Sequence, residues 1–521
     1  MDAAEKHELI DSFSDSNVLS PKEVSAERIQ LQKTVTILGG VGLIVGSIIG
    51  SGIFLSPKGV LAYTGSIGLS LVVWVLCGII ALFGALCYAE LGTAIPKSGA
   101  NYAYLFEAFG PIPAFLFSWT GTLVIRPSAA AIISMIFAEY VARPFYNDDQ
   151  GVPVMVIKLL AFFCIAEVST SVIQRCCGKC SKHASIITII NCVSVRWAVI
   201  IQNLFTFAKL TCVIILVIIG FIELGKGHTA NFKNSFNNTT SDIRHISFAF
   251  YYGLWAFGGW NSLNYVTEEM KNPGRDMPIA VIISMVIVIG CYVLCNIAYI
   301  SVLGKAGILK SPAVALELGN IYLGAGKFII PILVGLSCFG AVNGLAFSSG
   351  RLVYVAARDG HMPRVLSMVH VKRRTPLPSL LFLALVSTIM LIPDKAEFAT
   401  LINFFSFANW VFYGACFVAL IYLRFKRKDM ERPYKVFLPI PFIMILFSIF
   451  LTVIPITDKP KGSAIALAMI LAGLPAYLLF VHLDVLQYLP VPCKSCIESC
   501  LNSIQQSVGL AFPDNEHPVP C

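Results

Sequence analysis

Residues 46–54 read Gly46-Ser47-Ile48-Ile49-Gly50-Ser51-Gly52-Ile53-Phe54 and lie inside an apolar run that covers residues 37–63. A glycine in a helix interior costs roughly 1 kcal/mol relative to alanine. A seam of small residues between packed helices would need only Gly46 and Gly50. The group Gly50-Ser51-Gly52 exceeds what such a seam requires. The stretch therefore predicts that the helix backbone is unwound at this point.

A second apolar run, over residues 246–269, has a similar interruption at its middle. It reads Tyr252-Gly253-Leu254-Trp255-Ala256-Phe257-Gly258-Gly259-Trp260-Asn261. This is the sixth run of the chain, and matched breaks in the first and sixth spans are what an inverted repeat of five plus five helices predicts. In such a fold the free amides of a half-helix bind an anionic group and free carbonyls bind a cation. An α-amino acid carries both groups.

The composition indicates a membrane protein. Of the 521 residues, 57% are hydrophobic and 13% charged, and the mean hydropathy is +0.78, whereas soluble domains carry about 25% charged residues. The net charge of +9 comes from Lys and Arg in short gaps between apolar runs, which is the membrane pattern. The lipid bilayer is therefore an expected partner and nucleic acid is not.

Twelve apolar runs have the length of about 20 residues that a membrane helix needs. A spanning strand would have to belong to a closed barrel, so we expect an all-α membrane protein. The division is a tail (1–35), a transporter domain (36–485) and a second tail (486–521). The runs are 37–63, 68–94, 113–141, 152–171, 198–223, 246–269, 276–302, 327–357, 378–394, 398–424, 435–456 and 463–484.

The distribution of basic residues predicts the orientation. The gaps after the sixth, eighth and tenth runs are rich in Lys and Arg, so these gaps and both termini are expected in the cytoplasm. Residues 224–245 then lie outside the cell. They contain Asn237-Asn238-Thr239-Thr240, two overlapping glycosylation sequons at Asn237 and Asn238. We expect a multi-pass glycoprotein of the plasma membrane.

Residues 172–185 do not fit the pattern of spans. They begin at Val172, include Cys176, Cys177 and Cys180, and precede an apolar patch at 186–190 that is too short to span. The segment predicts either a cytoplasmic hairpin or an insertion that breaks span four. A second cluster consists of Cys493, Cys496 and Cys500. Neither cluster has a full metal-ligand set, so juxtamembrane palmitoylation is an alternative, and we expect neither metal nor cofactor.

Two basic residues lie inside apolar runs: Arg126 in the third and Lys209 in the fifth. Both should face protein or water, because a charge in hydrocarbon is expensive. In sodium-coupled carriers of the five-plus-five type, a sodium ion ties span one to span eight. The Lys209 ammonium, reaching the carbonyls of span one, would replace that ion and make transport sodium-independent. Arg126 is expected either to form a structural pair or to extend to the interface.

Three carboxylates lie near the expected cytoplasmic ends of spans two and six. A coupling role is one interpretation, but we favour solvated helix ends. They are Glu90, Glu268 and Glu269.

Several motifs make the sequence similar to the light-subunit family of heteromeric amino-acid transporters, within the amino acid–polyamine–organocation superfamily. The resemblance covers about residues 30–485. The motifs are Gly50-Ser51-Gly52-Ile53-Phe54, Tyr88-Ala89-Glu90-Leu91-Gly92-Thr93, Lys97-Ser98-Gly99-Ala100-Asn101-Tyr102, Ile125-Arg126-Pro127, the run from Trp255 to Asn261, Thr267-Glu268-Glu269, Asn343-Gly344 and Arg358-Asp359-Gly360-His361.

The resemblance implies a LeuT-type fold of twelve helices, with helices 1 and 6 broken, that exchanges amino acids by alternating access. It implies carboxylate binding at Ser51 and Gly52, with Trp255 as a gate. The expected substrate-binding residues are Ile49, Ser51, Gly52, Ile53, Trp255, Phe257, Gly258, Asn261 and Asn409.

The resemblance also bears on the substrate. The cystine–glutamate exchanger shares Arg126 but has an arginine where this chain has Asn409, so an anionic substrate is disfavoured. The cystine-and-dibasic exchanger has an aspartate where this chain has Gly258, which leaves dibasic substrates as an alternative. Neutral L-amino acids are expected, with Trp255, Phe257 and Phe407 forming an apolar rim.

The chain departs from the family in two places. The family's disulfide to a single-span glycoprotein heavy subunit uses a cysteine in the loop after span three, but residues 144–153 contain none. A heavy subunit would therefore bind noncovalently. Residues 167–185 also look inserted relative to the family. An amino-acid-sensing receptor and a uniporter or proton-coupled importer remain alternatives. No metal quartet, nucleophile elbow or phosphate loop suggests an enzyme.

Overall fold

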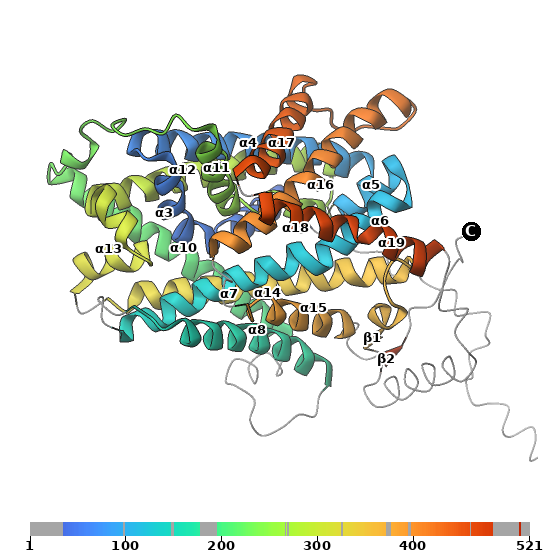
Figure 1. Cartoon of the computed structure of the whole chain (residues 1–521), viewed down its shortest axis with the longest axis horizontal. Coiled ribbons are helices and arrows are strands. Elements are labelled where there is room, and N and C mark those ends of the chain that lie inside the picture. The colour runs from blue at the N-terminus through green and yellow to red at the C-terminus, as the bar shows by residue number, and fades with distance from the viewer. Residues whose placement is uncertain are drawn as a thin grey trace, which may run out of the picture.

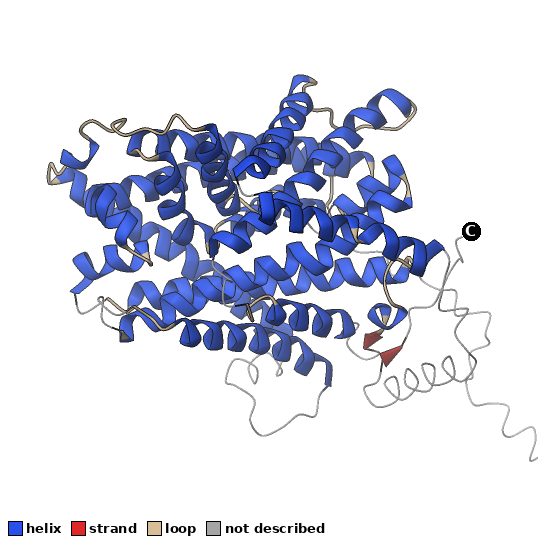
Figure 2. Ribbon diagram, in the orientation of Figure 1, coloured by secondary structure: helices blue, strands red, loops and turns tan. Residues whose placement is uncertain are grey.

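The fold consists almost entirely of helices (Figure 2). The computed structural model describes residues 35–482, apart from gaps at 97–98, 147–150, 178–194, 266, 268–269, 325–326, 371–376, 394–397 and 459, together with residues 510–511. In these ranges the strands are β1 (Val369–His370) and β2 (Leu510–Ala511), which pair antiparallel. Of the two expected tails only Val35 and residues 510–511 are described, and residues 178–185 of the expected insertion lie outside the described residues.

Each of the twelve expected runs overlaps at least one helix of the described chain. The long helices run mostly along the long axis of the molecule (Figure 1). The helices are α2 (Ile37–Ile48), α3 (Gly52–Thr64), α4 (Ile67–Ala94), α5 (Asn101–Phe109), α6 (Pro111–Thr120), η1 (Gly121–Ile125), α7 (Arg126–Ala142), η2 (Arg143–Phe145), α8 (Val154–Cys177), α10 (Val195–Gly225), η3 (Ala230–Phe232), α11 (Ile243–Ala256), η4 (Ser262–Tyr265), α12 (Pro273–Lys310), α13 (Val314–Leu323), α14 (Ile329–Arg358), η7 (Arg364–Ser367), α15 (Leu377–Ile389), α16 (Phe398–Lys426), α17 (Pro439–Asp458), α18 (Pro460–Leu471), α19 (Gly473–Tyr477) and η8 (Leu478–His482).

Length and composition qualify fewer helices as membrane spans than the sequence suggests. Eight helices of the described chain are long and apolar enough to cross a bilayer, and the bent pair α2–α3 brings the number to nine. Two of the other expected spans are short helices, since α11 has 14 residues and α15 has 13.

The break expected in the first span is present. α2 ends at Ile48, α3 begins at Gly52, and the two helices are bent by 54° relative to each other. Between them Ile49 has an extended backbone, with φ −70° and ψ 94°. The small residues at 50–52 thus mark the point at which the chain leaves one half-helix and enters the next.

The sixth span is interrupted as well. α11 ends at Ala256, and residues 257–261 form turns before η4 begins at Ser262. Gly259 has φ +106°, a backbone conformation that glycine adopts without the steric cost of a Cβ atom. The adjacent glycines therefore predict this break correctly.

The expectation of a solvated helix end is wrong for Glu90, which is only 2% exposed. Arg424, in the last turn of α16, donates from Nε and Nη2 to the two carboxylate oxygens of Glu90. The backbone N–H of Val436 also donates to Oε2 of Glu90, at 2.8 Å. The Nε atom of Arg432 lies 3.9 Å from Oε1. The carboxylate therefore fixes the end of α4 to α16 and to the loop before α17.

Replacing Arg424 with methionine should lower the thermal stability of the purified protein strongly. Removing one partner of a buried ion pair leaves an uncompensated charge and costs about 3–5 kcal/mol. Arg427→Met is the matched control, because the Arg427 side chain is 51% exposed where its Nη1 lies 3.2 Å from Glu107. Such surface pairs contribute up to about 1 kcal/mol. Equal melting temperatures for the two variants would contradict the structural role of the Glu90 pair.

Candidate functional site

The two interrupted spans cross each other at their breaks. A Cβ atom added to Gly52, the first residue of α3, would lie 2.4 Å from Cα of Ala256, the last residue of α11. A Cβ atom added to Gly259 would lie 3.1 Å from the backbone of Ser47 in α2. Glycines thus allow the backbones of both spans to approach without intervening side chains. The half-helix ends of the two spans consequently meet at one place.

The beginning of α3 offers amide groups at this crossing. Gly52 and Ile53 are its first two residues, and the first amides of a helix have no acceptor within the helix. Ser51 precedes them and makes no side-chain capping hydrogen bond. Ser51, Gly52 and Ile53 are all buried. This arrangement, which combines N–H groups with the positive end of the helix dipole, suits an anion such as a carboxylate.

Lys209 reaches the other half of the first span. Its Nζ atom, on α10, donates to the carbonyl oxygen of Gly46 at 2.5 Å, and the residue is 3% exposed. Gly46 lies in the last turn of α2, which has no basic residue of its own there. A cation near a helix C-terminus is favourable because the last carbonyls carry partial negative charge. Lys209 therefore supplies from α10 the charge that the end of α2 lacks.

Tyr292 is a residue of this site that the sequence analysis misses. Its hydroxyl, on α12, lies 2.9 Å from the carbonyl oxygens of both Ile48 and Ala256. These are the last residues of α2 and α11. Since a hydroxyl has one proton, it donates to one of the two carbonyls at a time. A buried tyrosine hydroxyl usually needs a polar partner. A tyrosine inside an apolar span therefore indicates that a polar group of the protein lies nearby.

Trp255, next to the last residue of α11, contacts Phe405 of α16. Their rings, from α11 and α16, make an edge-to-face contact with centroids 4.7 Å apart. Asn409 follows Phe405 by one helical turn on the same face of α16. The indole Nε1 of Trp255 is buried and has no hydrogen-bond partner within the described chain. The aromatic pair thus packs beside Ala256, the last residue of α11, at the crossing.

Two members of the expected apolar rim, Phe257 and Phe407, are buried side chains. Phe257 is 0% exposed and packs against Trp74 and Tyr292, with ring centroids 6.1 and 5.0 Å away. Phe407 is also buried.

Arg126 links α7 to the segment after the sixth-span break. Its Nη2 donates to the hydroxyl of Tyr265 in η4 at 2.8 Å, and its guanidinium carbon lies 5.8 Å from the centre of that ring. The π-helical turn η1 immediately precedes Arg126 and Pro127, which agrees with the frequent occurrence of such turns at functional positions. Arg126 is thus a structural pair. Its partner Tyr265 follows the break in the sixth span, whereas Trp255 precedes that break.

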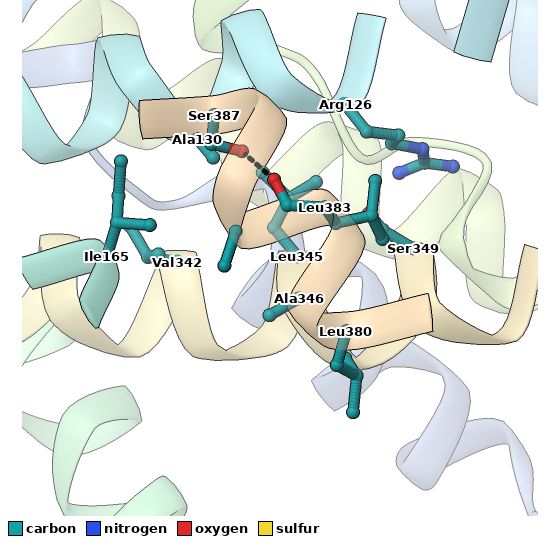
Figure 3. Close-up of a pocket in the computed structure, with 11 residues that line it drawn as sticks. Arg126, Ala130, Ile165, Val342, Leu345, Ala346, Ser349, Leu380, Leu383 and Ser387 are labelled. Carbon is teal, nitrogen blue, oxygen red and sulfur yellow. Dashed lines mark hydrogen bonds between the residues drawn. The ribbon is translucent and has the colours of Figure 1, made fainter. Parts of the chain in front are cut away.

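A small cavity lies beside Arg126, among α7, α8, α14 and α15 (Figure 3). Its volume is about 30 Å³, and its lining is mostly apolar, so it is of water size rather than amino-acid size. The charged end of Arg126 points away from Ser387 and Ile165 (Figure 3). No residue of either break lines this cavity, so it is separate from the crossing.

The remaining expected residues are distributed as follows. Gly258 and Asn261 lie in the turns that follow α11. Asn237 and Asn238 are exposed in the loop between α10 and α11. That loop is tied to neighbouring helices, because Thr240 N donates to Thr64 O at 3.0 Å and Gly68 N donates to Ser235 O at 2.7 Å. Within the described residues, no three His, Cys, Asp or Glu side chains are grouped as a metal site would require. Glu268, Glu269, Cys180 and the second cysteine cluster lie outside those residues.

Known proteins are similar to this chain along almost its whole length. The amino acid permease family matches residues 37–481. The b(0,+)-type amino acid transporter 1 of Mus musculus is 48% identical over 453 residues, 87% of this chain and 88% of that protein. The cystine/glutamate transporter of Homo sapiens is 44% identical over 458 residues, covering 88% and 87%. The large neutral amino acids transporter small subunit 2 of Rattus norvegicus is 40% identical over 506 residues, covering 96% and 90%.

Proposed function

Because the chain belongs to the amino acid permease family, and is therefore a membrane transporter and not an enzyme, we propose that it exchanges amino acids across the plasma membrane by alternating access. It does so without sodium, and its substrates are neutral L-amino acids. Its relatives include transporters named for large neutral amino acids and for cystine and glutamate.

The observation that carries the proposal is the crossing of the two breaks. Amides at the start of α3 and carbonyls at the end of α11 lie within one small region. The backbones of Gly52 and Ala256 are so close there that a Cβ atom added to Gly52 would lie 2.4 Å from Cα of Ala256. The amides of Ser51, Gly52 and Ile53 bind the substrate carboxylate. The carbonyls of Ile49 and of the end of α11 bind the ammonium, because a carbonyl oxygen accepts a second hydrogen bond through its other lone pair.

Four further residues complete the proposed site. Trp255 gates it with Phe405, and Asn261 and Asn409 line it. Gly258 leaves the site without an acidic group, which disfavours dibasic substrates, and Asn409 supplies no positive charge for an acidic one. An exchanger that also accepts dibasic amino acids is the nearest alternative.

Sodium independence rests on Lys209. Its ammonium donates to Gly46 O at the end of α2, so a fixed cation takes the place that a bound sodium ion would occupy beside the first break. Transport then needs no sodium gradient, and flux in one direction is driven by the amino acid that leaves on the other side.

The proposed architecture is a LeuT-type five-plus-five inverted repeat of twelve spans. Nine of them are the candidate spans given above, and the other three are α8, α11 with η4, and α15. Both termini are cytoplasmic and the loop between α10 and α11 is extracellular, where Asn237 and Asn238 are exposed glycosylation sites. A single-span glycoprotein heavy subunit binds noncovalently, because residues 144–153 contain no cysteine.

Counterflow in proteoliposomes tests the function. We expect labelled leucine loaded inside to leave only when a neutral amino acid is present outside, equally well in sodium and in choline buffer. A panel of external neutral, dibasic and acidic amino acids defines the substrate class. Efflux into amino-acid-free buffer would indicate a uniporter, and the absence of flux despite binding would indicate a sensor; either result contradicts exchange.

A further inference from the structure

A second, larger cavity is lined in part by α13, the helix at the end of the molecule opposite β1 and β2 (Figure 1). Its volume is about 220 Å³, compared with about 30 Å³ for the cavity beside Arg126. It is formed by η2 with Tyr146, by the connection from α12 to α13 together with α13 itself, and by Lys327 between α13 and α14. The polar residues that line it are Arg143, Tyr146, Ser311, Glu317, Asn320 and Lys327.

The charges in this cavity are of both signs. Arg143 and Lys327 are cationic, and Glu317 is anionic. A guanidinium has five N–H donors and a carboxylate has about four acceptor sites, so each can bind a ligand in addition to a protein neighbour. Carboxylate recognition by arginine is the pairing for which its planar fork is suited. The lining therefore complements a small molecule that carries a carboxylate and an ammonium.

The size of the cavity limits the ligand. Drug-sized ligands occupy pockets of about 300–1,000 Å³, and this cavity, at about 220 Å³, is below that range. Hydrogen-bonding groups from Ser311, Asn320 and Tyr146 complete a predominantly polar wall. A free amino acid fits this combination of small volume, opposite charges and polar lining better than a lipid or an apolar compound does.

The cavity is mechanically connected to the crossing of the two breaks through Tyr140. The Tyr140 hydroxyl, on α7, donates to the carbonyl oxygen of Phe54 in the first turn of α3 at 3.1 Å. It also accepts from the backbone N–H of Ala315 in α13 at 3.4 Å. Leu316 and Glu317, the next residues of α13, line the cavity. A ligand there would contact the helix that Tyr140 ties to the start of α3.

We propose that this cavity is a second binding site for a zwitterionic amino acid, outside the Trp255–Phe405 gate, which holds α13 against the end of α7. The orientation toward the extracellular side rests on the proposed function; the binding itself does not. An occupied outer site keeps α13 in contact with Tyr140 and so stabilises the packing of α13 against α7.

Equilibrium binding of labelled leucine to the purified full-length protein in nanodiscs tests the proposal. We expect two molecules bound per wild-type protein. The double variant Arg143→Gln/Glu317→Gln should bind one, with the lost site weakened at least tenfold. The retained central site shows that the variant is folded. Conversely, Gly52→Ala should keep the outer site and lose the central one.

The matched control is Glu223→Gln/Lys226→Gln, which removes one anion and one cation from a pair at the end of α10, where the two side chains lie 3.6 Å apart. This variant should still bind two molecules. A wild-type stoichiometry of one, or two sites retained in Arg143→Gln/Glu317→Gln, would overturn the proposal. Failure of counterflow alongside two binding sites would instead refute the exchange function and leave the outer site standing.

Discussion

Replacing Lys209 with methionine is expected to abolish amino-acid exchange while leaving the protein folded. Methionine keeps most of the length of the side chain but cannot donate to Gly46 O, to which Nζ is 2.5 Å away. A hydrogen bond to a charged group contributes about 1.5–3 kcal/mol, which corresponds to a fall of about 10- to 150-fold in the competent population. Loss of the positive charge at the end of α2 adds to this effect.

The measurement is leucine counterflow by the variant at matched protein density, with a melting curve to confirm folding. Lys226→Met is the control, because Lys226 belongs to the loop after α10 and its side chain is 52% exposed. The control should exchange at the wild-type rate. Wild-type exchange by Lys209→Met would refute the role of the ammonium as the fixed cation of the first span.

Replacing Gly52 with alanine is expected to have an effect of similar size by a steric route. The new Cβ atom would lie 2.4 Å from Cα and 2.9 Å from Cβ of Ala256. Overpacking of this kind forces backbone shifts that cost about 1–3 kcal/mol. The shift falls on the two half-helix ends that hold the substrate, so we expect leucine binding at the central site to be lost.

Gly42→Ala provides the matched comparison, because Gly42 lies in α2 of the same span and nothing lies within 4 Å of its added Cβ. It should bind and exchange leucine normally. If Gly52→Ala and Gly42→Ala exchange leucine equally well, the close approach of the two breaks has no functional importance.

The features that the sequence predicts best are those with a local cause. The breaks follow from Gly50 and Gly52 in the first span and from Gly258 and Gly259 in the sixth, because conformational freedom is a property of those residues themselves. Lys209 was recognisable because an ammonium inside an apolar run must find a partner within the protein. Its acceptor, Gly46 O, is 163 positions away in the sequence, so only the type of partner could be expected.

The features that the sequence does not predict arise from tertiary packing. Glu90 has the sequence position of a solvated helix end, and its partner Arg424 is 334 positions away. The sequence cannot identify the partners of the Tyr292 hydroxyl, because they are backbone carbonyls at the ends of two other helices. Phe257, adjacent to the break, turns into the core because Trp74 and Tyr292 provide a fully buried site for its ring. The outer cavity combines residues from 143–146, from 311–320 and Lys327, and none of these segments carries a motif.

Competition of leucine counterflow by leucine analogues that lack one charge tests the central claim most directly. Leucinol has the ammonium without the carboxylate, and 4-methylpentanoate has the carboxylate without the ammonium. If the amides of α3 and the carbonyls of α11 each hold one end of the substrate, both analogues should compete at least about 10-fold more weakly than leucine, since each loses a hydrogen bond to a charged group of about 1.5–3 kcal/mol. Competition by either analogue at the concentration at which leucine competes would contradict this account.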